Sequence, residues 1–200
     1  FLGAAAAFSV TGVYPSLDPL DYPRALRGTR SRTARAWPPY ADAFVIDFLA
    51  SPGYFNYPLN PPLDTEMITN AVESGITAVN LTCSGNDFAS SVERIAGWMD
   101  RIERHPDAFQ QVRTVADLRA AKENGRLGIV LGFQDTTPFE QDLAHIETFL
   151  RLGVKVTQLT YNVRNLVGDG CLEPANGGLT RYGHAVVERM NEVGMMVDLS

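Results

Sequence analysis

The sequence has few of the residues that build cysteine or histidine sites. Its 200 residues include two cysteines, Cys83 and Cys171, and three histidines. Two cysteines exclude a disulfide-dense scaffold and a four-cysteine zinc site. No run of 18 apolar residues occurs, so we expect no transmembrane helix.

Clustered positive charge is also scarce. The 17 Lys and Arg residues are outnumbered by 23 Asp and Glu residues, which gives a net charge of −6. The one basic cluster, within residues 24–35, lies in a stretch with Pro and Ser and on no expected helix or strand. Nucleic-acid binding needs clustered Lys and Arg, so we expect no nucleic-acid partner.

Residues 1–42 differ from the rest of the chain. They open with FLGAAAAFSVTGV, an apolar run of the length of an export-signal core, and continue with five prolines. The run resembles the core of twin-arginine export signals, although no arginine pair precedes it. We interpret residues 1–42 as the remnant of an export signal and a proline-rich leader, and expect an exported, periplasmic protein. A flexible Ala-rich tail is the alternative.

From residue 43 onward, apolar strand patterns alternate with helical ones. We expect strands over 43–49, 76–82, 127–133, 154–161 and 195–200, and helices over 64–73, 87–105, 114–124, 138–152 and 180–194. This alternation is typical of parallel βαβ units, which leave an open doubly wound sheet or a barrel. No G-x-G-x-x-G follows the first strand, which disfavours a dinucleotide-binding sheet.

The fold class predicted from this pattern is α/β, a TIM-like (β/α)₈ barrel. The five units over residues 43–200 would be its N-terminal part, since about 250 residues are typical of the fold. We therefore expect a fragment. We also expect the 200-residue piece not to fold stably alone, because it would expose sheet edges.

Active sites of such barrels lie where the strands end. Asp47 near the end of the first strand is a candidate, with a buried structural carboxylate as the alternative. Gln134, after the third strand, can orient a substrate amide because a carboxamide both donates and accepts hydrogen bonds. For Asp135 we favour a helix-capping role.

The long polar loop after the fourth strand supplies the other candidates for substrate binding: Tyr161, Asn162, Arg164 and Asn165. Arg164 would suit a substrate carboxylate, and the alternative is a loop held together by Asn side chains. Cys83 and Cys171 could face the same end and pair if the protein is exported. The three histidines lie on or beside expected helices, where we expect surface positions.

Residues 127–200 resemble the renal (membrane) dipeptidase family of zinc peptidases, and residues 43–126 do so more loosely. The resemblance rests on LGVKVTQLTYNVRN, on GGLTRYG and on MNEVGMMVDLS. It implies a TIM-like barrel with two zinc ions that hydrolyses dipeptides, with a homodimer as the expected assembly. The family's first-strand His and Asp ligands fall on Leu49 and Ser51, and its bridging Glu falls on Gln134.

These three residues make this chain a branch of the family with altered metal ligands. No ligand is assignable within the chain, and zinc would need ligands beyond residue 200. Our first hypothesis is a dipeptidase-like hydrolase of dipeptides or related small amides. The alternatives are a metal-poor member that binds a small molecule or performs other chemistry at the same barrel mouth, and a scaffold that binds a partner.

Overall fold

The computed structural model describes Tyr40 and residues 42–52 and 62–200. The predicted export signal and most of the leader therefore lie outside the described residues. The strands are β1 (Ile46–Asp47), β2 (Ala78–Thr82), β3 (Phe109–Gln111), β4 (Leu127–Phe133), β5 (Val154–Gln158) and β6 (Met196–Asp198). The helices are α3 (Thr65–Glu73), α4 (Phe88–Arg104), α5 (Val115–Glu123), the 3₁₀ helix η3 (Thr137–Phe139), α6 (Ala144–Leu152) and α7 (Arg181–Val193).

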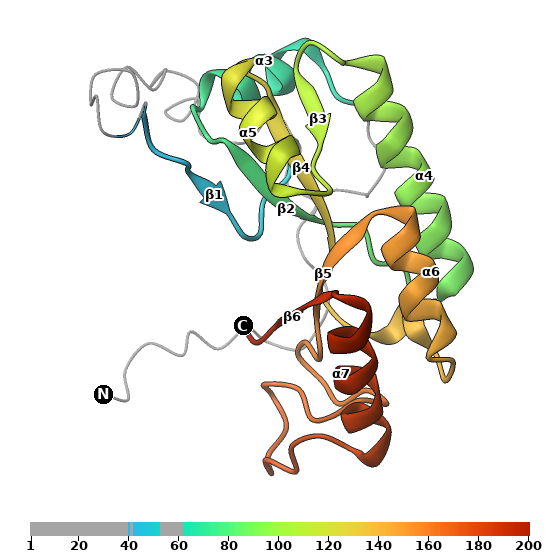
Figure 1. The fold of residues 1–200 in the computed structure, drawn as a ribbon. Coiled ribbons are helices and arrows are strands. Elements are labelled where there is room, and N and C mark those ends of the chain that lie inside the picture. The colour runs from blue at the N-terminus through green and yellow to red at the C-terminus, as the bar shows by residue number, and fades with distance from the viewer. Residues whose placement is uncertain (1–39, 41, 53–61) are drawn as a thin grey trace, which may run out of the picture.

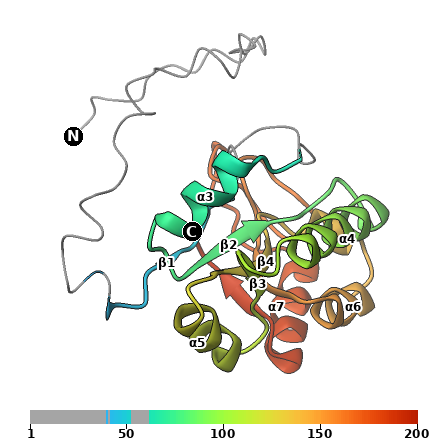
Figure 2. The same ribbon diagram turned by 90° about the horizontal axis from the view of Figure 1, so that it is seen from above.

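Within the described residues the strands form one parallel sheet. Its order is β1-β2-β4-β5-β6, and the short β3 pairs with the start of β4. Figure 1 shows the helices that connect successive strands, and Figure 2 shows α4, α5, α6 and α7 gathered on one side of the sheet. This arrangement confirms the α/β class and a half-barrel of parallel strands.

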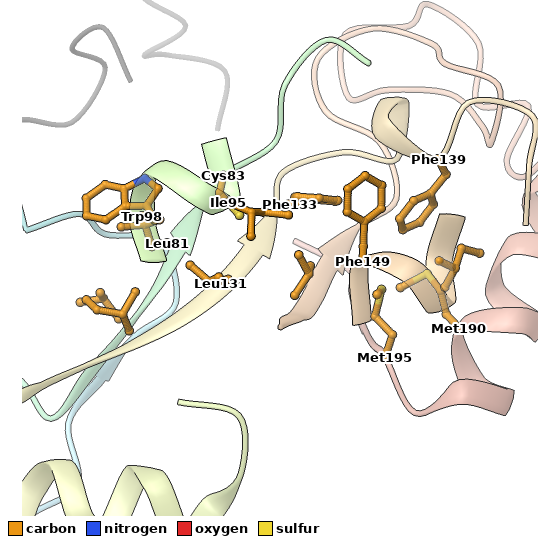
Figure 3. Packing of buried hydrophobic residues seen from close by; sticks show 14 of the residues in the cluster. Leu81, Cys83, Ile95, Trp98, Leu131, Phe133, Phe139, Phe149, Met190 and Met195 are labelled. Atoms are coloured by element: carbon orange, nitrogen blue, oxygen red, sulfur yellow. The ribbon is translucent and has the colours of Figure 1, made fainter. Parts of the chain in front are cut away.

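The hydrophobic core lies between the sheet and these helices. Alternate residues of the strands, such as Leu81, Leu131 and Phe133, pack against Ile95 of α4 and Phe149 of α6 (Figure 3). We call this side of the sheet the outer face. The opposite side, the inner face, carries Ala78, Asn80, Gly128, Val130, Gly132, Val156 and Gln158.

Side-chain caps set where the helices begin. Asp64, Asp87, Thr114 and Thr180 each accept a hydrogen bond from a backbone N–H in the first turn of the helix that follows. Such bonds satisfy donors that have no partner within the helix. The residue types at these positions had predicted the same four helix starts, so this part of the fold is encoded locally.

The pairing of β4 with β5 contains one irregularity. Leu131 pairs with Val154, but the next residue, Gly132, pairs with Val156, so Lys155 is an extra residue in β5. Beyond this bulge Thr157 pairs with Phe133 on the outer face, and Val156 and Gln158 lie on the inner face.

Two predicted elements differ clearly from the structure, and one strand was not predicted. The strand expected over 43–49 is reduced to Ile46–Asp47, because the Asp47 carboxylate accepts the Leu49 N–H at 2.9 Å and turns the chain. The helix expected over 138–152 begins only at Ala144, because η3 and a Glu140 with φ of 52° come first. The strand β3 was not predicted, since Phe109–Gln111 has no apolar alternation.

The strands β5 and β6 were predicted, with longer bounds than the structure gives them. No helix among the described residues is long and apolar enough to cross a membrane.

Candidate active site

The parallel strands all end at one edge of the sheet, and Gln134 lies there. It directly follows Phe133, the last residue of β4, whose ring is buried on the outer face, and the chain bends at Gln134 itself. Its side chain is half-buried, and its carboxamide makes no hydrogen bond to the described residues. The Gln134 carboxamide is therefore available to a ligand.

The first strand does not bring its expected residues to one face. Regular pairing ends at Asp47, and residues 48–49 form a bend. The Leu49 side chain is exposed, and Ser51 lines a cavity of about 300 Å³ beside α3. Period-two alternation, which would place Asp47, Leu49 and Ser51 on one face of a strand, is therefore absent from this segment.

Asn165 holds the long loop after β5 to the neighbouring loop. Its Nδ2 donates to the Leu159 carbonyl at 2.9 Å and to Thr136 Oγ1 at 3.2 Å, and its Oδ1 accepts the N–H groups of Val167 and Gly168. All its polar atoms are thus engaged within the protein. The structure supports the loop-stapling alternative for this residue.

Arg164 is also engaged inside the loop. Its Nε donates to Asp169 Oδ1 at 2.5 Å, and Asp169 Oδ2 accepts the Gly177 N–H at 2.6 Å. The hydrogen bond from Arg164 and the one from the Gly177 backbone lower the pKa of Asp169. The same ion pair raises the pKa of Arg164. A substrate carboxylate would have to compete with Asp169 for this guanidinium.

Tyr161 and Asn162 lie exposed at the start of the loop, where a ligand at the strand ends could reach them. Asn162 Oδ1 accepts a weak hydrogen bond from Cys171 Sγ at 3.7 Å. Cys171 is exposed, whereas Cys83 is buried on the outer face, and both are free thiols. The disulfide considered for an exported protein is therefore not present.

Burial makes Cys83 a poor nucleophile. Loss of water around the thiol raises its pKa to about 12, and the interaction with the Gly132 backbone lowers the pKa only in part. The thiolate is the reactive form of cysteine. Cys83 therefore belongs to the core and takes no part in the chemistry of the site.

The histidines lie on the helical side of the sheet. His105 caps the end of α4, His145 in α6 stacks on Phe88 at 4.1 Å, and His184 lies in α7. Among the described residues, no group of three or more His, Cys, Asp or Glu side chains could hold a metal ion.

Sequence reasoning missed three polar residues of the inner face: Asn80, Gln158 and Asp198. Asn80 is buried, and its Nδ2 donates to the Phe48 carbonyl at 3.0 Å. Gln158 pairs in register with Asp198, and its Nε2 donates to the Ser200 carbonyl. Alternation along β2 could have identified Asn80. The face on which Gln158 lies could not be predicted, because the bulge at Lys155 interrupts the alternation of β5.

The sequence of residues 62–200 matches the model of the membrane dipeptidase family, peptidase family M19. The chain belongs to the membrane dipeptidase family. The match includes every strand from β2 to β6, and the resemblance on which the altered ligand positions rest is thereby confirmed.

Individual relatives agree with this assignment. The chain is 34% identical over 101 residues to dipeptidase verJ of Clonostachys rogersoniana, covering 50% of this chain and 26% of that protein. An amidohydrolase from Pseudomonas aeruginosa is 38% identical, with a TM-score of 0.70 over 80% of this chain and 46% of that one. A Rhodobacter sphaeroides metallopeptidase liganded with a phosphinate mimic of L-Ala-D-Ala shares the fold at 16% identity and a TM-score of 0.61. The alignment with the Rhodobacter sphaeroides protein covers 78% of this chain and 58% of that one.

The described residues do not fit the two-metal centre that the family resemblance implies. Leu49 has no donor atom, Ser51 offers only a neutral hydroxyl, and Gln134 offers a neutral amide. A bridging ligand must offset the charge of two cations, which a carboxylate does and a carboxamide does not. No reaction step through a metal is therefore derived from these residues.

Proposed function

We propose that the full-length protein is a dipeptidase-like hydrolase that cleaves dipeptides or related small amides. The observation that carries this proposal is the family match over residues 62–200, because that segment contains the strands whose ends form the candidate site. The chain spans about a quarter of its curated relative and about half of the solved structures. Hydrolysis by the whole protein is therefore a proposal.

The first experiment measures amino acids released from dipeptides by the purified full-length protein. A panel with L- and D-configured C-terminal residues, read by mass spectrometry, covers the substrate class. We expect release of both amino acids from at least one member. The absence of release from the whole panel would contradict the proposal.

A matched pair of variants assigns this activity to the protein and not to a contaminant. Gln134→Leu removes the free carboxamide at the strand ends, and Gln141→Leu makes the same change at an exposed turn beyond η3. We expect at least a tenfold loss of kcat/KM for the first variant and none for the second. Equal rates in both would show that the measured hydrolysis does not use this site.

We also propose the arrangement of the rest of the protein. The parallel half-barrel supports a complete TIM-like (β/α)₈ barrel in which residues 43–200 are the N-terminal part. The apolar run in residues 1–13 supports export to the periplasm. Cell fractionation with mass spectrometry of the mature N-terminus tests the export, and light scattering of the full-length protein tests the expected homodimer.

A further inference from the structure

Polar side chains from four neighbouring strands lie on the inner face or at the strand ends. Gln158 pairs with Asp198 in the register of β5 and β6. Phe133 pairs with Thr157, so the residues that follow this pair, Gln134 and Gln158, come close together at the strand ends. The buried Asn80 pairs with Val130, further toward the strand starts, and its Oδ1 reaches the inner side of Gly132. These four residues are three carboxamides and one carboxylate.

Several polar atoms of this group have unused hydrogen-bonding capacity. The Gln134 carboxamide has no partner among the described residues, and Gln158 engages its Nε2 with Ser200 while its Oε1 has no hydrogen bond there. Asn80 Oδ1 is buried without a partner. Buried or half-buried polar groups without partners lower stability, and functional sites commonly carry them.

The chemistry of these atoms favours an amide ligand. A carboxamide offers one donor group and one acceptor, which match the C=O and N–H of a peptide bond. Gln134 Nε2 can donate to the ligand carbonyl, and Gln158 Oε1 can accept from the ligand N–H. Asp198 binds Ser200 through Oδ1, and its Oδ2, with no hydrogen bond among the described residues, suits a ligand ammonium group.

We propose that this edge recognises the amide of a small amino-bearing ligand through the neutral carboxamides of Gln134 and Gln158, where a two-metal centre would otherwise sit. The proposal rests on the proposed function, because it names how the same site recognises that substrate. It goes further in separating substrate recognition from metal binding. Leu49 and Ser51, which supply no charged ligand, agree with it.

The first test counts metal ions on the full-length protein. The protein is incubated with excess Zn²⁺, separated from free metal by gel filtration, and its zinc content is measured by plasma mass spectrometry. We expect clearly fewer than two ions per chain. Two tightly held ions per chain would overturn the proposal.

The second test measures binding of alanyl-alanine by calorimetry in the presence of a chelator. We expect the wild type to bind and Gln134→Glu to bind roughly tenfold more weakly, since the substitution removes the donor. The control Gln141→Glu makes the same change on an exposed turn and should leave Kd unchanged. Loss of wild-type binding in chelator, or an unchanged Kd in Gln134→Glu, would overturn the proposal.

Failure of this inference can be told apart from failure of the proposed function. Binding in chelator without any release of amino acids would leave the inference standing and contradict the hydrolase. Hydrolysis that requires two bound zinc ions would contradict the inference and leave the proposed hydrolase standing.

Discussion

The two faces of the sheet are built from different residues. The outer face carries large apolar side chains, such as Leu131 and Phe133, which are buried completely under the helices. The inner face carries smaller apolar residues and polar ones, such as Gly132, Val156 and Gln158. The difference shows that stability is concentrated on one face, which leaves the other free for polar groups that a dry core would exclude.

The largest expected effect comes from breaking the outer face. Phe149 is fully buried, and its ring lies 4.8 Å from Phe133 and 5.0 Å from Phe88. We expect Phe149→Ala to lower the free energy of unfolding by about 3–5 kcal/mol, because it leaves a cavity. Denaturant unfolding measures this, and Leu172→Ala at an exposed position is the control. Equal losses in both variants would mean that the outer face is not the main source of stability.

The reactivity of the two cysteine thiols tests how tightly the outer face is closed, because Cys83 is buried there and Cys171 is exposed. Burial raises the pKa of Cys83 to about 12, so its reactive thiolate is scarce at pH 8. We expect an aromatic disulfide reagent to modify Cys171 rapidly and Cys83 only after unfolding. Cys171→Ser should abolish the rapid phase. A rapid phase that persists in this variant would show that the outer face opens easily.

A smaller effect is expected from filling the inner face. A Cβ on residue 132 would lie 2.2 Å from Asn80 Oδ1, so Gly132 leaves the room that this amide occupies. We expect Gly132→Ala to cost about 1–3 kcal/mol of unfolding free energy. The cost should fall in an Asn80→Ala background, where the clash is gone. An equal cost in both backgrounds would show that the contact with Asn80 is not the cause.

The smallest effect concerns the loop at the rim of the inner face. Arg164 holds the pKa of Asp169 below its ordinary value, so the pair stabilises the fold above about pH 4, and this contribution is lost as pH falls through the lowered pKa. Unfolding midpoints between pH 6 and pH 3 should decline more in wild type than in Asp169→Asn. Parallel declines would mean that the exposed ion pair contributes nothing.

The sequence predicted much of the outer face and little of the inner one. The caps at Asp64, Asp87 and Thr180 and the apolar strand patterns are local signals, so the helix starts and the strands β2 and β4 were found. The inner-face cluster depends on register between strands distant in sequence, and no local pattern reports that register. Gln134 was found because a strand end is visible in the sequence. Gln158 and Asp198 were not found, because only the pairing of β5 with β6 brings these two residues together.

The extra residue Lys155 changes which side chains of β5 point to each face of the sheet. Val154 and Val156 have the same parity in sequence, yet they lie on opposite sides of the sheet because Lys155 is skipped in the pairing. Deleting Lys155 would leave Val156, Thr157 and Gln158 on their present faces, whereas pairing Lys155 with Gly132 would exchange the faces of Thr157 and Gln158. Which side chains of β5 lie on the inner face thus depends on this one extra residue as much as on the residue types around it.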